Sequence, residues 1–208
     1  MLWTLEAARQ SRYIDRLILS SDDPGIIDVA VKAGCEAPFR RAASLATDEA
    51  SSVDVVVDAI ERVPGYDIVV LLQPTSPLRI AADIDGVLDL LLSSGAPACV
   101  TLRAAVEHPY WTFQLGAGGL IAPFAEAPGG MPHRRQDAPA GWCLNGAVYA
   151  ARVDWFLHMR SFVTTKTVGY PMPAERSLDI DTIEDVDKLQ SMIALQNCLV
   201  QPGRKERE

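Results

Sequence analysis

The sequence lacks closely spaced cysteines, paired histidines and any long apolar run, and each absence excludes a class of protein. Its four cysteines lie far apart without CxxC spacing, and its three histidines form no HxH or HExxH pair. The cysteine pattern indicates a reduced, cytoplasmic protein, and the histidine pattern argues against a zinc site. No apolar run reaches the roughly 20 residues of a membrane-spanning helix. The mixed-charge N-terminus does not have the pattern of a signal peptide.

Positive charge is also scarce. Lys and Arg number 19 against 27 Asp and Glu, which gives a net charge of -8 and a pI near 4.9. This balance disfavours nucleic-acid binding and binding to an anionic membrane surface. A small anionic substrate would need local arginines or a metal ion to overcome the overall field.

What is present is the composition of an ordinary globular protein. Hydrophobic residues make up 49% of the chain and charged residues 22%, which excludes disorder, collagen-like repeats and coiled coil as the main architecture. The length of 208 residues predicts a single domain over 1–208. No internal repeat is visible.

Helical and strand-like segments alternate along the chain. We expect five helices: from Leu2 towards Ile14, from Pro24 as far as Gly34, over 51–63, over 82–93, and after Thr182. The last begins with a Thr-x-x-Asp pattern that is typical of a capping box. We expect strands over 16–20, 67–72, 97–102 and 147–150. The apolar run at 67–72 is typical of a parallel strand buried on both faces. The alternation predicts an α/β fold with a mostly parallel sheet and helices on both faces.

Residues 104–143 interrupt this alternation. The stretch is rich in Gly, Pro and aromatic residues and has weak periodicity. Because long structureless loops are uncommon in compact domains, we interpret it as an insertion that leaves the sheet and forms an interface or a lid. The last residues, 201–208, are typical of a solvated, frayed tail.

The strongest local motif follows the predicted strand 67–72. It runs Gln73-Pro74-Thr75-Ser76-Pro77-Leu78-Arg79, a stiff loop that carries an amide, two hydroxyls and a guanidinium. Ligands of open α/β sheets bind at the carboxyl ends of strands, and the prolines position the polar groups at little entropic cost. An ordinary strand-to-helix turn explains the same residues equally well.

A second motif is Ser177-Leu178-Asp179-Ile180-Asp181. Alternate side chains of an extended segment share a face, so the two carboxylates can converge on one hard cation from about 7 Å apart. Taken alone, a capping role for Asp181 and simple exposure of Asp179 explain the motif better.

Two arginine-bearing segments complete the set. Arg134-Arg135-Gln136-Asp137 lies ten residues before Asn145-Gly146, and paired arginines suit a carboxylate or a phosphate. Arg41 precedes Ser51-Ser52, where the amides of a helix N-terminus can face an anion. The simpler interpretation of residues 134–137 is a solvated charged loop, and that of the Arg41 and Ser51-Ser52 segment is a normal helix cap.

Together these motifs resemble those of the acylneuraminate cytidylyltransferases, or CMP-sialic acid synthetases. The matching stretches are IDRLILSSDD, RAASLATDEASS, LLQPTSPLR, RRQDAPAGWCLNGAVY and SLDIDTIEDV, in the family's order and at about its spacing. The resemblance implies a Rossmann-like nucleotidyltransferase fold. It implies that the anomeric hydroxyl of a nine-carbon 2-keto sugar acid attacks the α-phosphate of CTP and that pyrophosphate leaves.

The resemblance also implies roles for particular residues. Asp179 and Asp181 would hold Mg²⁺, and Gln73 would join them as a catalytic group. The implied substrate-binding residues are Arg41, Ser51 and Ser52 at the nucleotide, Gln73, Thr75, Ser76 and Arg79 along the sugar and nucleotide cleft, and Asn145 and Tyr149 at its border. The insertion would be the arm of a homodimer, with Arg135 and Gln136 reaching towards the sugar site of the partner.

The chain departs from the family pattern at two places. Cys143 stands where some members have an arginine, which bears on the choice of acyl sugar. The glycine-bearing L-A-x-R-x-G-S-K loop that wraps CTP in the family, with its preceding central strand, does not occur in residues 1–208. We therefore expect these residues by themselves to make CMP-sugars poorly.

Three alternatives remain open. A start codon upstream of Met1 would restore the enzyme. A truncated, non-catalytic paralogue would bind sugar or nucleotide, or dimerise. A cytidylyltransferase for another sugar acid, such as ketodeoxyoctonate, would keep the same chemistry.

Overall fold

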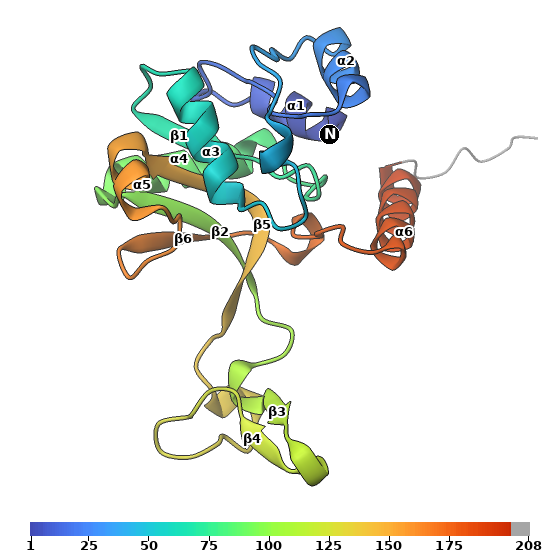
Figure 1. Ribbon diagram of the computed structural model, residues 1–208. Helices are drawn as coiled ribbons and strands as arrows, with labels where there is room; N and C mark the ends of the chain where they lie inside the picture. Colours follow the sequence, from blue (N-terminus) through green and yellow to red (C-terminus); the bar gives the residue numbers. More distant parts are fainter. Residues whose placement is uncertain (201–208) are drawn as a thin grey trace, which may run out of the picture.

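The computed structural model describes residues 1–200, with side chains as far as Leu195 (Figure 1). The helices are α1 (Leu2–Arg9), α2 (Pro24–Lys32), α3 (Ser52–Arg62), α4 (Ala81–Ser94), α5 (Val153–Met159) and α6 (Ile183–Val200). The strands are β1 (Ile68–Leu71), β2 (Ala98–Ala104), β3 (Phe113–Leu115), β4 (Ile121–Pro123), β5 (Trp142–Arg152) and β6 (Thr167–Pro171). The predicted tail, 201–208, lies outside the described residues.

The main sheet has the strand order β1-β5-β2-β6. Strand β5 pairs antiparallel with both β1 and β2, and β2 pairs parallel with β6. Three strands therefore run in one direction and β5 runs against them. The sequence predicted a mostly parallel sheet, and β1, β2 and β6 do share one direction. Because β5 lies between β1 and β2, two of the three neighbouring strand pairs are nevertheless antiparallel. Among the described residues β1 has no strand on its other edge.

Two apolar layers cover the faces of this sheet. One face packs Cys99 and Val148 against α4 and α1, with Ile84 and Leu91 fully buried. The other face packs Val100 against α3, α5 and Phe162 in a second cluster. Helices on both faces of one sheet give the three-layer α/β arrangement that the sequence predicts.

Most of the predicted helices begin and end where local chemistry dictates. Asp23 accepts a hydrogen bond from the Ile26 amide at 2.9 Å and caps α2, and Ser51 caps α3 through the Val53 amide. Gly95 ends α4 with a φ of 68°, a left-handed conformation that glycine adopts without strain. Helix α1 ends at Arg9, short of Ile14.

Three expectations about the sheet need correction. Residues 16–20 form no strand, and Ile18 makes only an isolated bridge with Glu36. Strand β1 is half-buried and antiparallel to its neighbour, whereas a parallel strand buried on both faces was expected. Helix α5 and strand β6 were not predicted, because both are short and β6 contains a glycine and ends in a proline.

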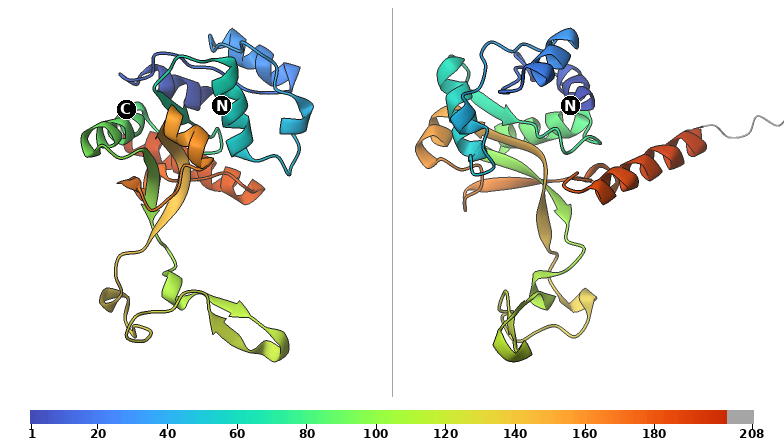
Figure 2. Two further views of the ribbon diagram at one scale, coloured as in Figure 1. Left: turned by 60° about the vertical axis from the view of Figure 1, so that its left-hand side comes forward. Right: turned by 45° about the vertical axis from the view of Figure 1, so that its right-hand side comes forward.

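Residues 105–141 leave the sheet, as predicted, and form an arm (Figures 1 and 2). Strands β3 and β4 make a separate two-stranded sheet within it. At its base the His108 ring contacts those of Tyr110 and Trp111, and the Trp111 indole donates a hydrogen bond to the Pro132 carbonyl. The insertion therefore has its own structure and is not an irregular loop.

Helix α6 also projects from the body, in a different direction from the arm (Figure 2). The Asp185 carboxylate accepts hydrogen bonds from the amide and hydroxyl of Thr182, so the expected capping pattern is present at its start. Of the predicted apolar stripe, Leu189 is buried, Val186, Met192 and Ile193 are half-buried, and Leu195 is exposed.

Candidate active site

The site is built on an irregularity in β5. Val100 of β2 faces Tyr149, but Leu102 faces Leu144, so residues 145–147 form a bulge. Gly146 in this bulge has a φ of 73°, and Thr101 stabilises it by exchanging hydrogen bonds with the backbone of Val148. Bulges of this kind occur next to active sites, where they redirect side chains.

Two of the predicted catalytic side chains meet at Gly146. A methyl group placed on its Cα would lie 2.8 Å from Gln73 Oε1 and 2.9 Å from Asp179 Oδ2. Only glycine leaves room for both. The two motifs, separated by more than 100 residues, therefore converge on one point of the sheet, which the sequence predicted only through the family resemblance.

A buried network joins the loop after β1 to the Asp179 segment. Asn145 Nδ2 donates to Ser177 Oγ at 3.0 Å, and Ser76 Oγ donates to the Asn145 carbonyl at 3.3 Å. The Ile180 amide donates to the Thr75 carbonyl at 2.9 Å. The side chains of Asn145 and Ser76 are thus used for internal hydrogen bonds and fix the shape of the site.

Arg79 lies behind the loop and not on an open cleft wall. It is 2% exposed and donates to the carbonyls of Gln73 and Ala147 at 3.2 and 2.5 Å. Burial lowers the pKa of its guanidinium to about 10, partly offset by the nearby Asp83. Through Nη1 the guanidinium ties the loop to β5, while its Nε and Nη2 are buried without a partner among the described residues. Its role at the substrate stays a prediction.

The carboxylate of Asp179 has one oxygen that is buried and has no hydrogen-bond partner among the described residues. Asp181 is exposed, and its amide donates to the Asp185 carboxylate. The side chains that the structure describes contain no cluster of three or more His, Cys, Asp or Glu residues. One or two carboxylates suffice for Mg²⁺ when substrate phosphates supply other ligands, and an unpartnered buried carboxylate oxygen fits that ion.

The predicted nucleotide-binding residues lie on two other segments. Ser51 and Ser52 are exposed at the start of α3, and the Ser51 side chain is already engaged as its cap. Arg41 forms an ion pair with Asp22 at 3.5 Å, while its buried Nε has no partner in the described part of the chain. The simple capping interpretation of Ser51 is confirmed.

The remaining predicted residues divide between the sheet and the arm. Tyr149 lies on β5 beside Phe162, and burial, followed by the charge of Asp179, raises the pKa of its phenol. Arg135 donates to the Ala105 and Val106 carbonyls at the base of its own arm. Gln136 is exposed, and neither it nor Arg135 meets the Gly146 site in this chain alone.

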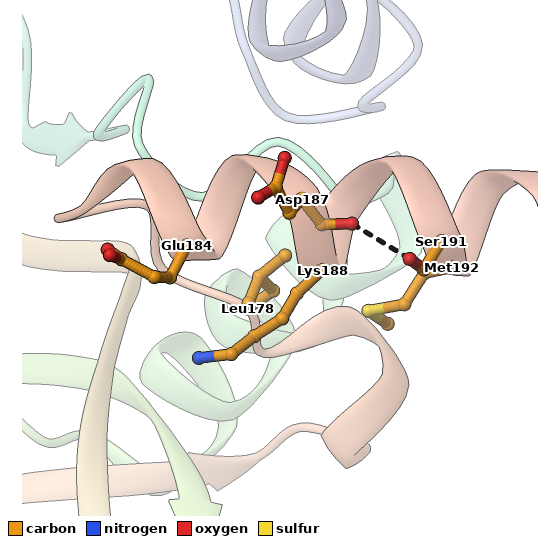
Figure 3. Close-up of a pocket in the computed structure, with 6 residues that line it drawn as sticks. All are labelled: Leu178, Glu184, Asp187, Lys188, Ser191 and Met192. Atoms are coloured by element: carbon orange, nitrogen blue, oxygen red, sulfur yellow. Dashed lines mark hydrogen bonds between the residues drawn. The ribbon is translucent and has the colours of Figure 1, made fainter.

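A separate pocket lies along α6 (Figure 3). Leu178 lines it together with Glu184, Asp187, Lys188, Ser191 and Met192. None of the predicted site residues borders it. Sequence reasoning missed Asp83 and Arg176, which support the site from behind, and gave no role to Ser177, although the motif at 177–181 begins with it. The position of Arg176 directly before that motif was the available signal.

No helix of the described part of the chain is long and apolar enough to cross a membrane.

Comparison with known proteins gives a consistent result. The family profile described as cytidylyltransferase matches residues 1–113. The chain is 31% identical over 192 residues to the pseudaminic acid cytidylyltransferase of Campylobacter jejuni, covering 89% of this chain and 81% of that protein. It is 30% identical over 184 residues to the N-acylneuraminate cytidylyltransferase of Streptococcus agalactiae, covering 88% of this chain but only 44% of that protein.

The solved structure of a CMP:2-keto-3-deoxy-manno-octonic acid synthetase complexed with CTP resembles this chain with a TM-score of 0.63. The match covers 94% of this chain and 88% of that one at 16% identity, and it shows the Rossmann-like nucleotidyltransferase fold. The chain therefore belongs to the cytidylyltransferase family.

Proposed function

We propose that the protein transfers a cytidylyl group from CTP to the anomeric hydroxyl of a sialic-acid-like 2-keto sugar acid. The hydroxyl oxygen bonds to the α-phosphorus, the bond to pyrophosphate breaks, and the hydroxyl proton is lost. The products are a CMP-sugar and pyrophosphate. The observation that carries this proposal is the meeting of Gln73 and Asp179 at Gly146, in a chain of this family.

The names of the relatives support the substrate class. They are described as acting on acylneuraminate and pseudaminic acid, which are both nine-carbon 2-keto sugar acids, and the similar solved structure contains CTP. These names agree on CTP chemistry and differ in the sugar. Since the chain spans less than half of the Streptococcus protein, activity and substrate are proposals for this chain.

Magnesium is the cofactor that we propose. Asp179, with its unpartnered buried oxygen, would hold it, together with Asp181 and the substrate phosphates. When bound, the ion neutralises negative charge on the phosphates. The protein itself carries a charge of -8, so CTP and a sugar carboxylate need such local compensation.

The chain's own residues position the reactants. Because Gly146 has no side chain, Gln73 Oε1 and Asp179 Oδ2 both lie close to its backbone, and this places the amide and the carboxylate side by side. Arg79 and Asn145 hold the loop and the bulge that carry this arrangement. For phosphoryl transfer, positioning and electrostatic stabilisation supply most of the catalysis.

We also propose that the arm forms a homodimer. It exposes several large apolar side chains, Phe113, Leu115, Leu120, Ile121, Phe124 and Met131. Monomeric proteins rarely expose so many on one feature. Leu115 and Ile121 face each other across β3 and β4. The double substitution Leu115→Lys with Ile121→Glu is expected to lower the mass in sedimentation, whereas Ile26→Glu on α2 is not; an unchanged mass would refute the arm as the interface.

The activity is tested with protein expressed from the complete reading frame, including any in-frame codons upstream of Met1, alongside residues 1–208. Pyrophosphate release and the CMP-sugar mass are measured with CTP, Mg²⁺ and sialic, legionaminic, pseudaminic or ketodeoxyoctonic acid. Turnover with a nine-carbon acid supports the proposal, and turnover only with ketodeoxyoctonic acid assigns the other substrate class. An in-frame stop upstream, with CTP or sugar binding but no product, supports the non-catalytic paralogue.

A further inference from the structure

Asp83 is a fully buried carboxylate with no part in the chemistry proposed above. Its side chain is 0% exposed, and it lies in the first turn of α4, directly after the Gln73–Arg79 loop. A buried carboxylate is costly unless it is paired and hydrogen-bonded. The reason for its presence is therefore found in its partners.

The main partner is Arg176, which lies 93 residues further along the chain. Its Nε donates to Asp83 Oδ2 at 2.9 Å and its Nη2 donates to Asp83 Oδ1 at 2.9 Å. This is the bidentate geometry in which arginine holds a carboxylate in a fixed orientation. Asp83 Oδ2 also accepts from the Ile80 amide at 3.1 Å, so both of its oxygens are satisfied.

The ion pair fixes the segment that carries Asp179. The chain leaves β6 at Pro171 and crosses to the β5 bulge, with Arg176 three residues before Asp179. Ser177 is held by Asn145, and the Ile180 amide is held by the Thr75 carbonyl. Arg176 is thus the first of three successive attachments, and it is the one that joins this segment to α4.

We propose that Arg176, held by Asp83, is a positioning residue that sets the distance of the Asp179 carboxylate from Gln73 at Gly146. Arg176 does not touch substrate in this role. It acts through the backbone of residues 177–181. This inference rests on the proposed function, since it assigns the support for the residue that would hold Mg²⁺.

Arg176→Ala and Arg176→Lys are the test variants, and Arg12→Ala is the matched control. Arg12 also forms ion pairs with aspartates of α4, Asp85 and Asp89, but it lies on the surface with its side chain 64% exposed. Each variant is measured in the full-length protein by amide hydrogen exchange of residues 177–182 and by the Mg²⁺ concentration for half-maximal pyrophosphate release.

We expect Arg176→Ala to lose the protection of the Ile180 amide while residues 148–151 of β5 keep theirs. The Mg²⁺ requirement should rise about tenfold or more, as for loss of a residue that orients a metal ligand. Arg176→Lys should fall between Arg176→Ala and the parent, and Arg12→Ala should match the parent. If Arg176→Ala does not fold, the Lys variant carries the test.

A lower melting temperature with unchanged exchange at 177–182 and an unchanged Mg²⁺ requirement would overturn the positioning role. Absence of turnover in the parent protein refutes the proposed function instead. In that case hydrogen exchange, which needs no catalysis, still decides whether Arg176 holds the Asp179 segment.

Discussion

Replacing Gly146 with alanine tests the geometry of the site most sharply. Its φ of 73° is in the left-handed region, where a side chain costs about 1–2 kcal/mol. In addition, the new methyl group would lie 2.8 Å from Gln73 Oε1 and 2.9 Å from Asp179 Oδ2. Because Gly146 belongs to a central strand, we expect the two side chains to move and not the backbone.

Gly95→Ala is the matched control. Gly95 has a φ of 68°, and no atom lies within 4 Å of its added methyl group. Both variants should lose similar stability from backbone strain, a fall in Tm of about 2–4 °C for each kcal/mol in a protein of this size. Gly146→Ala should have an additional loss, which comes from the contacts at the site.

The assay is pyrophosphate release at a temperature where both variants are folded. A displacement of a reacting group by about 1 Å can cost roughly 100-fold in rate, so we expect Gly146→Ala to lose about that factor while Gly95→Ala keeps parental turnover. Equal turnover in the two glycine variants would refute the convergence of Gln73 and Asp179 as the basis of activity.

Three further changes test separate parts of the structure. Burial raises the pKa of the Cys99 thiol from its ordinary 9.0 to about 12, so between these pH values the folded state keeps a proton that the unfolded state loses. The free energy of unfolding should therefore fall as pH rises from 9 towards 12. Chemical denaturation across this range should show a shallower fall for Cys99→Ala than for the parent. Arg79→Ala removes the guanidinium hydrogen bonds to the Gln73 and Ala147 carbonyls. The Gln73 carbonyl keeps the Ser76 amide as a donor, so we expect a loss of about 1–3 kcal/mol, mainly at the Ala147 carbonyl, and a urea midpoint equal to that of the parent would contradict this. Asp23→Ala should lower stability by about 1 kcal/mol through loss of the α2 cap without changing turnover.

Local sequence signals predicted the helices well. The caps of α2 and α3 at Asp23 and Ser51, and the glycine stop at Gly34, depend on neighbouring residues alone. Strand pairing depends on distant residues. The apolar run at 16–20 was therefore misjudged as a strand, and the antiparallel insertion of β5 between β1 and β2 could not be read from the sequence.

In the candidate site, too, local motifs were visible in the sequence, whereas contacts between distant residues were not. Gln73 and Asp179 were identified by motif, but their meeting at Gly146 depends on a bulge whose register is set by β2. The substrate role of Arg79 was implied by the family resemblance alone, and its burial follows from packing that no local pattern reveals. The bond between Asp83 and Arg176 joins positions that no local pattern relates, and only the folded chain shows it.

The measurement that bears most directly on the central claim compares the parent protein, expressed from the complete reading frame, with its Asp179→Asn variant. With CTP, Mg²⁺ and a nine-carbon 2-keto sugar acid, we predict that the parent releases pyrophosphate and forms a CMP-sugar of the expected mass. Asp179→Asn should fold with a similar Tm and form almost none, since a neutral amide binds Mg²⁺ poorly. A parent without product, or an Asp179→Asn variant with parental turnover at the same Mg²⁺ concentration, would contradict the account.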